Sequence, residues 1–147
     1  ARFNASKRVY RYYLHLDKNP FLSAQSLHFT KKLNFDAMNK ASELLLGKQD
    51  FTSFSKVHTD VKTNICTISK AKWTPISDSE FYFEIAADRF LRNMVRAIVG
   101  TLIEVGLNKI NLDDLSQIIA SKNRSEAKMS VPAHALYLWR IYYPEIE

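Results

Sequence analysis

The sequence predicts an α+β fold: a single domain with a mainly antiparallel sheet and helices packed on one of its faces. Runs rich in aromatic and β-branched residues interchange with segments whose apolar residues recur every three or four positions. Their order, βαββααβ, extends the split βαβ arrangement by one helix. The 147 residues contain no internal repeat or low-complexity tract, so we expect one domain.

The first strand is expected over residues 8–16, RVYRYYLHL, where Tyr and Val partly alternate with polar residues and the turn sequence DKNP follows. A helix is expected next over residues 34–47, NFDAMNKASELLLG. Its apolar residues have helical spacing, Asn34 or Asp36 can cap its start, and Gly47 is typical of a helix end.

A β-hairpin is predicted by the two β-rich runs TNICTISKAKWTP, residues 63–75, and SEFYFEIAA, residues 79–87, which a short polar segment separates. The hairpin leads into a long helix over residues 88–105. Asp88 is placed to cap the start of this helix, and Gly106 is placed to end it.

The last two elements are a helix over residues 112–121, LDDLSQIIAS, and a strand over residues 135–144, ALYLWRIYYP, which ends at a proline. The final strand completes the sheet that the first strand and the hairpin begin.

Composition favours a polyanionic partner. The chain has 21 Lys and Arg against 15 Asp and Glu, a net charge of +6 and an isoelectric point near 9.4. Its single cysteine, Cys66, argues against a disulfide framework and fits a reducing cytoplasm. No run approaches the roughly 20 apolar residues of a membrane span. We therefore expect a cytoplasmic protein with no membrane association.

Three arginines share one side of the helix expected over residues 88–105. At about 100° per residue, Arg89, Arg92 and Arg96 fall within about 60° of one another. Such a stripe is either a solvated surface or a binding surface. Gly100 lies on the same side, where a missing Cβ permits close packing.

The usual signatures of metal and cofactor sites are missing from the sequence. It has no Gly-rich phosphate loop, no CxxC pair and no HExxH, and its four histidines lack ligand spacing. We expect neither a metal nor a nucleotide cofactor.

Four segments, in this order along the chain, resemble the C-terminal part of tRNA pseudouridine synthases of the TruA type. They are ARFNASKRVYRYYL, LLGKQDFTSFSK, FEIAADRFLRNMVRAIVGTLIEVG and ALYLWRIYYP. The resemblance implies isomerisation of uridine to pseudouridine in the anticodon stem-loop of tRNA, without a cofactor, by an enzyme that usually works as a homodimer. Gln49 stands where the family usually has His, and Ala135 where it usually has Gly.

The resemblance also implies roles for three residues. Arg96 matches the arginine of the family's MVR and would orient the catalytic aspartate and hold it ionised. Tyr10 matches a tyrosine that would stack on the extruded uracil, and Leu136 would line the apolar side of the pocket. The family's aspartate lies in a GRTDxGVH-like motif that residues 1–147 do not contain. We therefore expect this chain to be a C-terminal domain, inactive alone.

Basic residues near these motifs are candidates for contacts to the RNA backbone. Such contacts position the RNA and make its binding depend on salt. The candidates are Arg2, Lys7, Arg8, Arg89 and Arg92, with Lys122, Arg124 and Lys128 as a second cluster.

Two other function classes remain open at this point. A non-catalytic RNA-binding module would present stacking aromatic residues, such as those of RVYRYYL and FYFEI, on the open face of the sheet. A GRTDxGVH-like stretch upstream of Ala1 would favour the enzyme, and its absence the module. A protein-interaction domain would have no salt-sensitive affinity for RNA.

The first prediction concerns RNA binding. With a net charge of +6, the chain should bind tRNA weakly, and its affinity should fall steeply with salt because bound phosphates release counterions. Filter-binding titrations at two salt concentrations measure this. The absence of any affinity for tRNA, or an affinity that does not change with salt concentration, would contradict the prediction.

Overall fold

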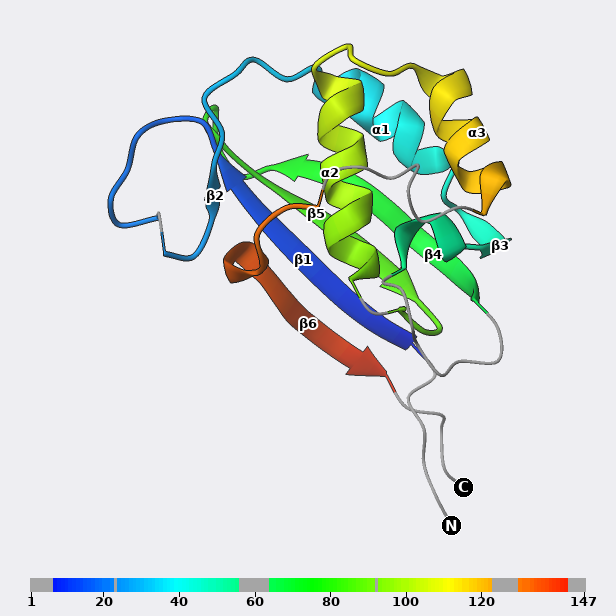
Figure 1. The fold of residues 1–147 in the computed structure, drawn as a ribbon. Coiled ribbons are helices and arrows are strands. Elements are labelled where there is room, and N and C mark those ends of the chain that lie inside the picture. Colours follow the sequence, from blue (N-terminus) through cyan, green and yellow to red (C-terminus); the bar gives the residue numbers. More distant parts are fainter. Residues whose placement is uncertain (1–6, 23, 56–63, 92, 123–129, 143–147) are drawn as a thin grey trace.

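A computed structural model describes residues 7–22, 24–55, 64–91, 93–122 and 130–142 (Figure 1). The described part contains six strands, three α-helices and two 3-10 turns. In chain order these are β1 (Lys7–His15), β2 (Leu27–His28), α1 (Phe35–Glu43), β3 (Gly47–Asp50), η1 (Thr52–Phe54), β4 (Ile65–Pro75), β5 (Glu80–Ala87), α2 (Met94–Gly106), α3 (Leu112–Ser121), η2 (Ala133–Ala135) and β6 (Leu136–Tyr142).

The strands form one sheet in the order β2-β1-β5-β4-β3, with β6 also paired to β1. One edge of β1 pairs with β5 along residues 8–15. Its other edge is shared by β6, which pairs with residues 7–12, and by β2, which pairs with residues 14 and 15. Among the described strands, only the pairing of β1 with β2 is parallel. The predicted α+β fold, with a mainly antiparallel sheet, is confirmed.

The three helices cover one face of this sheet (Figure 1). Side chains on that face of the strands, such as Tyr12, Phe83 and Ile85, are fully buried beneath them. In α2, every residue except Arg96 and Glu104 is buried. None of the helices in the described ranges is long and apolar enough to cross a membrane.

The long helix begins later than the sequence predicts, at Met94 and not at Asp88. Asp88 accepts a hydrogen bond from the backbone of Thr67, at 2.8 Å, and so joins the hairpin instead of capping the helix. Asn93 has a left-handed backbone, φ 69°, which a helix cannot continue through. The predicted stripe of three arginines is therefore wrong, because Arg89 lies outside the helix.

The remaining boundaries are close to those predicted, with two strands missed. Asn34 caps α1 by accepting from the backbone of Ala37. That helix ends at Glu43, and Gly47, with φ 95°, opens β3. The short strands β2 and β3 have little β propensity of their own and form by pairing with β1 and β4.

A buried histidine lies at the end of β1. The Nδ1 atom of His15 is 2.9 Å from Ser26 Oγ, and its ring stacks on that of His28 with centroids 5.0 Å apart. Within the described residues, its Nε2 atom has no hydrogen-bond partner. Burial lowers the pKa of His15, and the neighbouring His28 and His134 add to this effect, while Glu80 and Asp17 oppose it.

The lowered pKa of His15 predicts loss of stability in mild acid. Because the folded state binds this proton less readily than the unfolded state, the free energy of unfolding should fall as the pH drops below about 6.5, the ordinary pKa of histidine. Urea unfolding of the parent and of His15→Asn between pH 7 and 5 tests this. His15→Asn should flatten the slope, and the exposed His28→Gln should retain most of it. Equal slopes in parent and His15→Asn would refute the prediction.

Ile98 tests the packing of α2. It is 1% exposed, so Ile98→Asp buries an uncompensated charge and should lower the free energy of unfolding by more than about 4 kcal/mol. Gln117→Asp adds the same charge at an exposed position of α3 and should change stability little. Thermal melts in which Ile98→Asp behaves like Gln117→Asp would contradict the observed packing.

Candidate active site

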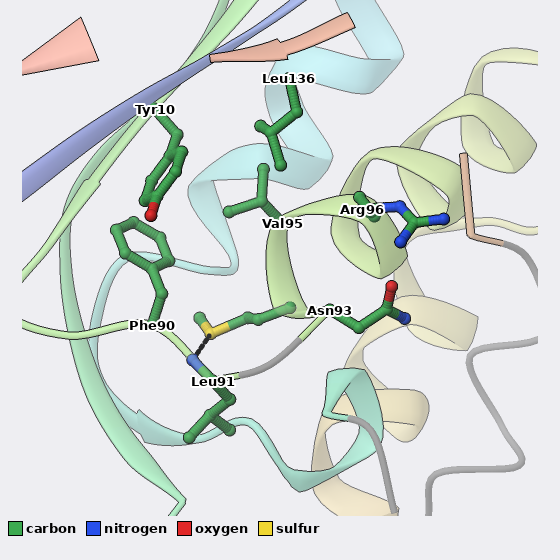
Figure 2. A pocket seen from close by; sticks show the side chains of 8 residues that line it. Tyr10, Phe90, Leu91, Asn93, Val95, Arg96 and Leu136 are labelled. Atoms are coloured by element: carbon green, nitrogen blue, oxygen red, sulfur yellow. Dashed lines mark hydrogen bonds between the residues drawn. The ribbon is translucent and has the colours of Figure 1, made fainter. Parts of the chain in front are cut away.

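A pocket of about 400 Å³ opens where the start of α2 meets β1 and β6 (Figure 2). It is lined by Tyr10, Phe90, Leu91, Asn93, Met94, Val95, Arg96 and Leu136. Three of these are the residues for which the family resemblance implies catalytic or uridine-binding roles: Tyr10, Arg96 and Leu136. The fold therefore brings together side chains from the first strand, the long helix and the last strand.

Aromatic and aliphatic side chains form one side of the pocket. Tyr10 projects from β1 toward the helices, and its ring meets that of Phe90 edge to face, with centroids 5.0 Å apart and planes at 85°. Leu136 and Val95 lie beside Tyr10 (Figure 2). The backbone N–H of Leu91 points to the sulfur of Met94 at 3.5 Å. This contact holds the chain just before α2 against the first residue of that helix. This side offers an apolar surface on which a flat ring can pack.

Arg96 supplies the positive charge. Its Nε donates to the backbone oxygen of Val131 at 2.8 Å, and the Val131 N–H donates back to the Arg96 oxygen at 3.2 Å. Within the described residues, its two terminal nitrogens donate no hydrogen bond, and no Asp or Glu lines the pocket. Arg96 thus presents the planar end of its guanidinium, the geometry that binds a carboxylate at two points.

The segment of residues 130–132, here the strap, crosses beside the start of α2. Asn93 Nδ2 donates to Ser130 Oγ at 2.9 Å, and the hydroxyl of Tyr12 donates to the oxygen of Pro132 at 2.7 Å. Burial raises the pKa of Tyr12 despite the nearby charge of Arg96, so this hydroxyl stays a neutral donor. The strap leads through η2 directly to Leu136 and so fixes where β6 enters the pocket.

The structure does not gather the predicted RNA-binding residues that it describes at one place. Arg8 projects to the same face of the sheet as Tyr10, and it pairs with Ala87, two residues before Arg89. Lys7 projects to the opposite face, with its amine 4.7 Å from the ring centroid of Tyr142.

The second predicted basic cluster is described only in part. Lys122, at the end of α3, lines a separate hollow with Asp50. The other predicted RNA-binding residues lie outside the described residues: Arg2, Arg92, Arg124 and Lys128.

The open face of the sheet, opposite the helices, does carry aromatic residues. There the guanidinium of Arg11 lies 3.8 Å from the ring centroid of Trp139 and 4.2 Å from that of Tyr82. Its Nε also donates to Glu84 at 2.7 Å. Arg11 therefore covers ring surface on which a base of a single-stranded RNA would have to stack.

The sequence did not single out the residues that complete the pocket, namely Phe90, Leu91, Asn93, Met94 and Val95. All five belong to the run FLRNMVR, residues 90–96. Helical periodicity predicts them to be helix residues, but Phe90, Leu91 and Asn93 precede the helix. Asn93 offered a signal, because asparagine before an apolar run commonly marks a helix start.

The chain is similar to known proteins over nearly its whole length. The family model described as tRNA pseudouridine synthase matches residues 41–144. A tRNA pseudouridine synthase A from Porphyromonas gingivalis is 54% identical over 98% of this chain and 58% of its own length. Proteins of the same name from Bacteroides fragilis and Bacillus subtilis are 50% and 39% identical over 99% and 97% of the chain. The chain spans about 58% of the length of each of the three.

Proposed function

The chain belongs to the tRNA pseudouridine synthase family, and on this basis we propose that it forms the uridine-binding side of an enzyme that isomerises uridine to pseudouridine in the anticodon stem-loop of tRNA. The observation that carries the proposal is that Arg96, Tyr10 and Leu136 line one pocket, and that within the described residues the two terminal nitrogens of Arg96 donate no hydrogen bond. With tRNA as substrate, we place the reaction in the cytoplasm.

The reaction rearranges one nucleotide without net gain or loss of atoms. The bond between C1′ of the ribose and N1 of uracil breaks, the base turns, and C5 bonds to C1′ while its proton is lost and N1 gains one. The freed base must stay bound and shielded from water while it turns. Tyr10 offers a ring for stacking, and Val95 and Leu136 beside it extend the apolar surface.

The carboxylate that this chemistry needs would come from outside this chain. Within the described residues, the two terminal nitrogens of Arg96 donate no hydrogen bond, so they can bind this carboxylate. The chain spans about 58% of the length of its relatives, so other parts of the whole protein can supply it. A carboxylate bound by the planar guanidinium would be oriented toward C1′ and held ionised, because the adjacent cation lowers its pKa. We therefore expect residues 1–147 alone to be inactive. The resemblance to the family implies in addition that the whole protein acts as a homodimer.

Arg8 and Arg89 support binding of the tRNA backbone beside this pocket. Both are half-buried, so their stems pack against protein, and Nη1 of Arg89 also donates to the backbone oxygen of Ile65 at 3.2 Å. Each carries a positive charge, which attracts phosphate. The alternative of an RNA-binding module on the open face has less support, since Arg11 already stacks on Tyr82 and Trp139 there.

Arg96→Lys in the whole enzyme tests the proposed role of Arg96. Lysine keeps the charge but loses the planar end that binds a carboxylate at two points, so the rate of pseudouridine formation from bound tRNA should fall at least about a hundredfold with little change in affinity. Single-turnover assays at saturating enzyme, with affinity measured separately, give both quantities.

Arg89→Ala is the matched control, because Arg89 lies outside the pocket lining. It should weaken tRNA binding and leave the rate from bound tRNA close to the parental value. If Arg96→Lys instead reacts at the parental rate once bound, Arg96 binds the RNA backbone and does not orient a catalytic carboxylate.

A further inference from the structure

Asn93 begins α2 in an unusual way. The other two helices also start with asparagine, and the side chains of Asn34 and Asn111 accept hydrogen bonds from the first turn of their helices. Both have an extended backbone, as is usual for this position. Asn93 instead has a left-handed backbone, φ 69° and ψ 4°, and makes no side-chain hydrogen bond to its helix. Its amide is directed elsewhere.

That amide binds the strap. Each of the three strap residues is held by one residue at or near the pocket: Ser130 by the Asn93 side chain, Val131 by Arg96 through two hydrogen bonds, and Pro132 by the Tyr12 hydroxyl. Asn93 and Arg96 are three positions apart and project to the same side of the first turn of α2 (Figure 2). They therefore form hydrogen bonds with two neighbouring residues of the strap.

The position of the strap decides the orientation of Arg96. Its Nε bonds to the Val131 oxygen at 2.8 Å, and this bond sets the plane of the guanidinium and so the direction of the two terminal nitrogens. Ser130 is exposed, so little packing holds that end of the strap apart from the hydrogen bond with Asn93. Loss of this bond would let the Val131 oxygen move and the guanidinium turn with it.

We propose that Asn93 is a positioning residue for Arg96. Its left-handed backbone places Phe90 and Leu91 in the pocket wall and starts the helix at Met94, and its amide fixes the strap that orients the guanidinium. The proposal rests on the proposed function, because it assigns Asn93 a share in the rate of pseudouridine formation without contact to the reacting atoms.

The test uses two variants that break the same hydrogen bond from opposite sides. Asn93→Gly tolerates the left-handed backbone and removes the side chain with its amide, and Ser130→Ala removes only the hydroxyl. Asn108→Gly is the control, because Asn108 also has a left-handed backbone, φ 63°, but lies exposed beyond the other end of α2. Each variant is made in the whole enzyme and in residues 1–147.

In the whole enzyme, Asn93→Gly and Ser130→Ala should each lower the single-turnover rate from bound tRNA between about tenfold and a hundredfold, since small misplacements of a catalytic group have effects of this size. The affinity for tRNA and the melting temperature should stay near the parental values. The double variant should be no slower than the slower single variant, because both changes remove one interaction. Asn108→Gly should react at the parental rate.

A parental rate in Asn93→Gly, or a double variant whose loss is the product of the two single losses, would overturn the proposal.

Hydrogen exchange of the Val131 amide in residues 1–147 gives a second measurement that needs no activity. This amide donates to the oxygen of Arg96, and it should exchange faster in both variants but not in Asn108→Gly. If the parental enzyme is inactive but the Val131 amide exchanges faster in both variants than in the parent, the proposed function is overturned. The role of Asn93 in holding the strap is then still supported. Unchanged exchange would overturn that role itself.

Discussion

The hydrogen bond from Arg96 Nε to the carbonyl oxygen of Val131 joins two segments that are 35 residues apart in the sequence. One is the first turn of the buried helix α2, and the other is the strap that leads into β6. This contact holds the residues that precede Leu136 beside Arg96. With it, the last strand of the sheet enters the pocket at a fixed point, and the cation has a fixed plane.

The helix can hold such a contact because it cannot move easily. All of its residues except Arg96 and Glu104 are buried, and a Cβ added at Gly106 would lie 2.5 Å from the sulfur of Met38 in α1. Close packing on several sides leaves a helix little freedom to shift or rotate. A functional side chain placed on the first turn of such a helix is therefore positioned by the whole core, which suits a site that must orient a reacting group.

Most of the fold could be predicted from the sequence, because its main elements carry strong local signals. The alternating residues of β1, the β-rich hairpin and the capped helices α1 and α3 place hydrophobic side chains with the correct period. The errors arose where tertiary contacts decide the structure. Asp88 resembles a helix cap, but it bonds to Thr67 across the hairpin, and β3 forms only because β4 is there to pair with it.

The pocket could be predicted only in part. The resemblance to a known family named Tyr10, Arg96 and Leu136, whereas helical periodicity grouped Arg96 with the wrong neighbours. Periodicity assumes that the helical turn continues, and the left-handed backbone of Asn93 breaks that assumption at the position that matters most. The strap could not be predicted at all, since its bonds to Asn93, Arg96 and Tyr12 depend on where the chain returns after α3.

Under the proposed function, the chemistry of the pocket would link catalysis to assembly. A half-buried guanidinium with unused donors is tolerable while water can reach it, but the same group buried by another part of the protein would carry a large desolvation cost. A carboxylate supplied by that part would offset this cost by binding the two terminal nitrogens. Under the proposed function, the ion pair that orients the catalytic group would also favour closure of the site around Arg96. Correct assembly and correct geometry at the reacting carbon would then depend on the same contact.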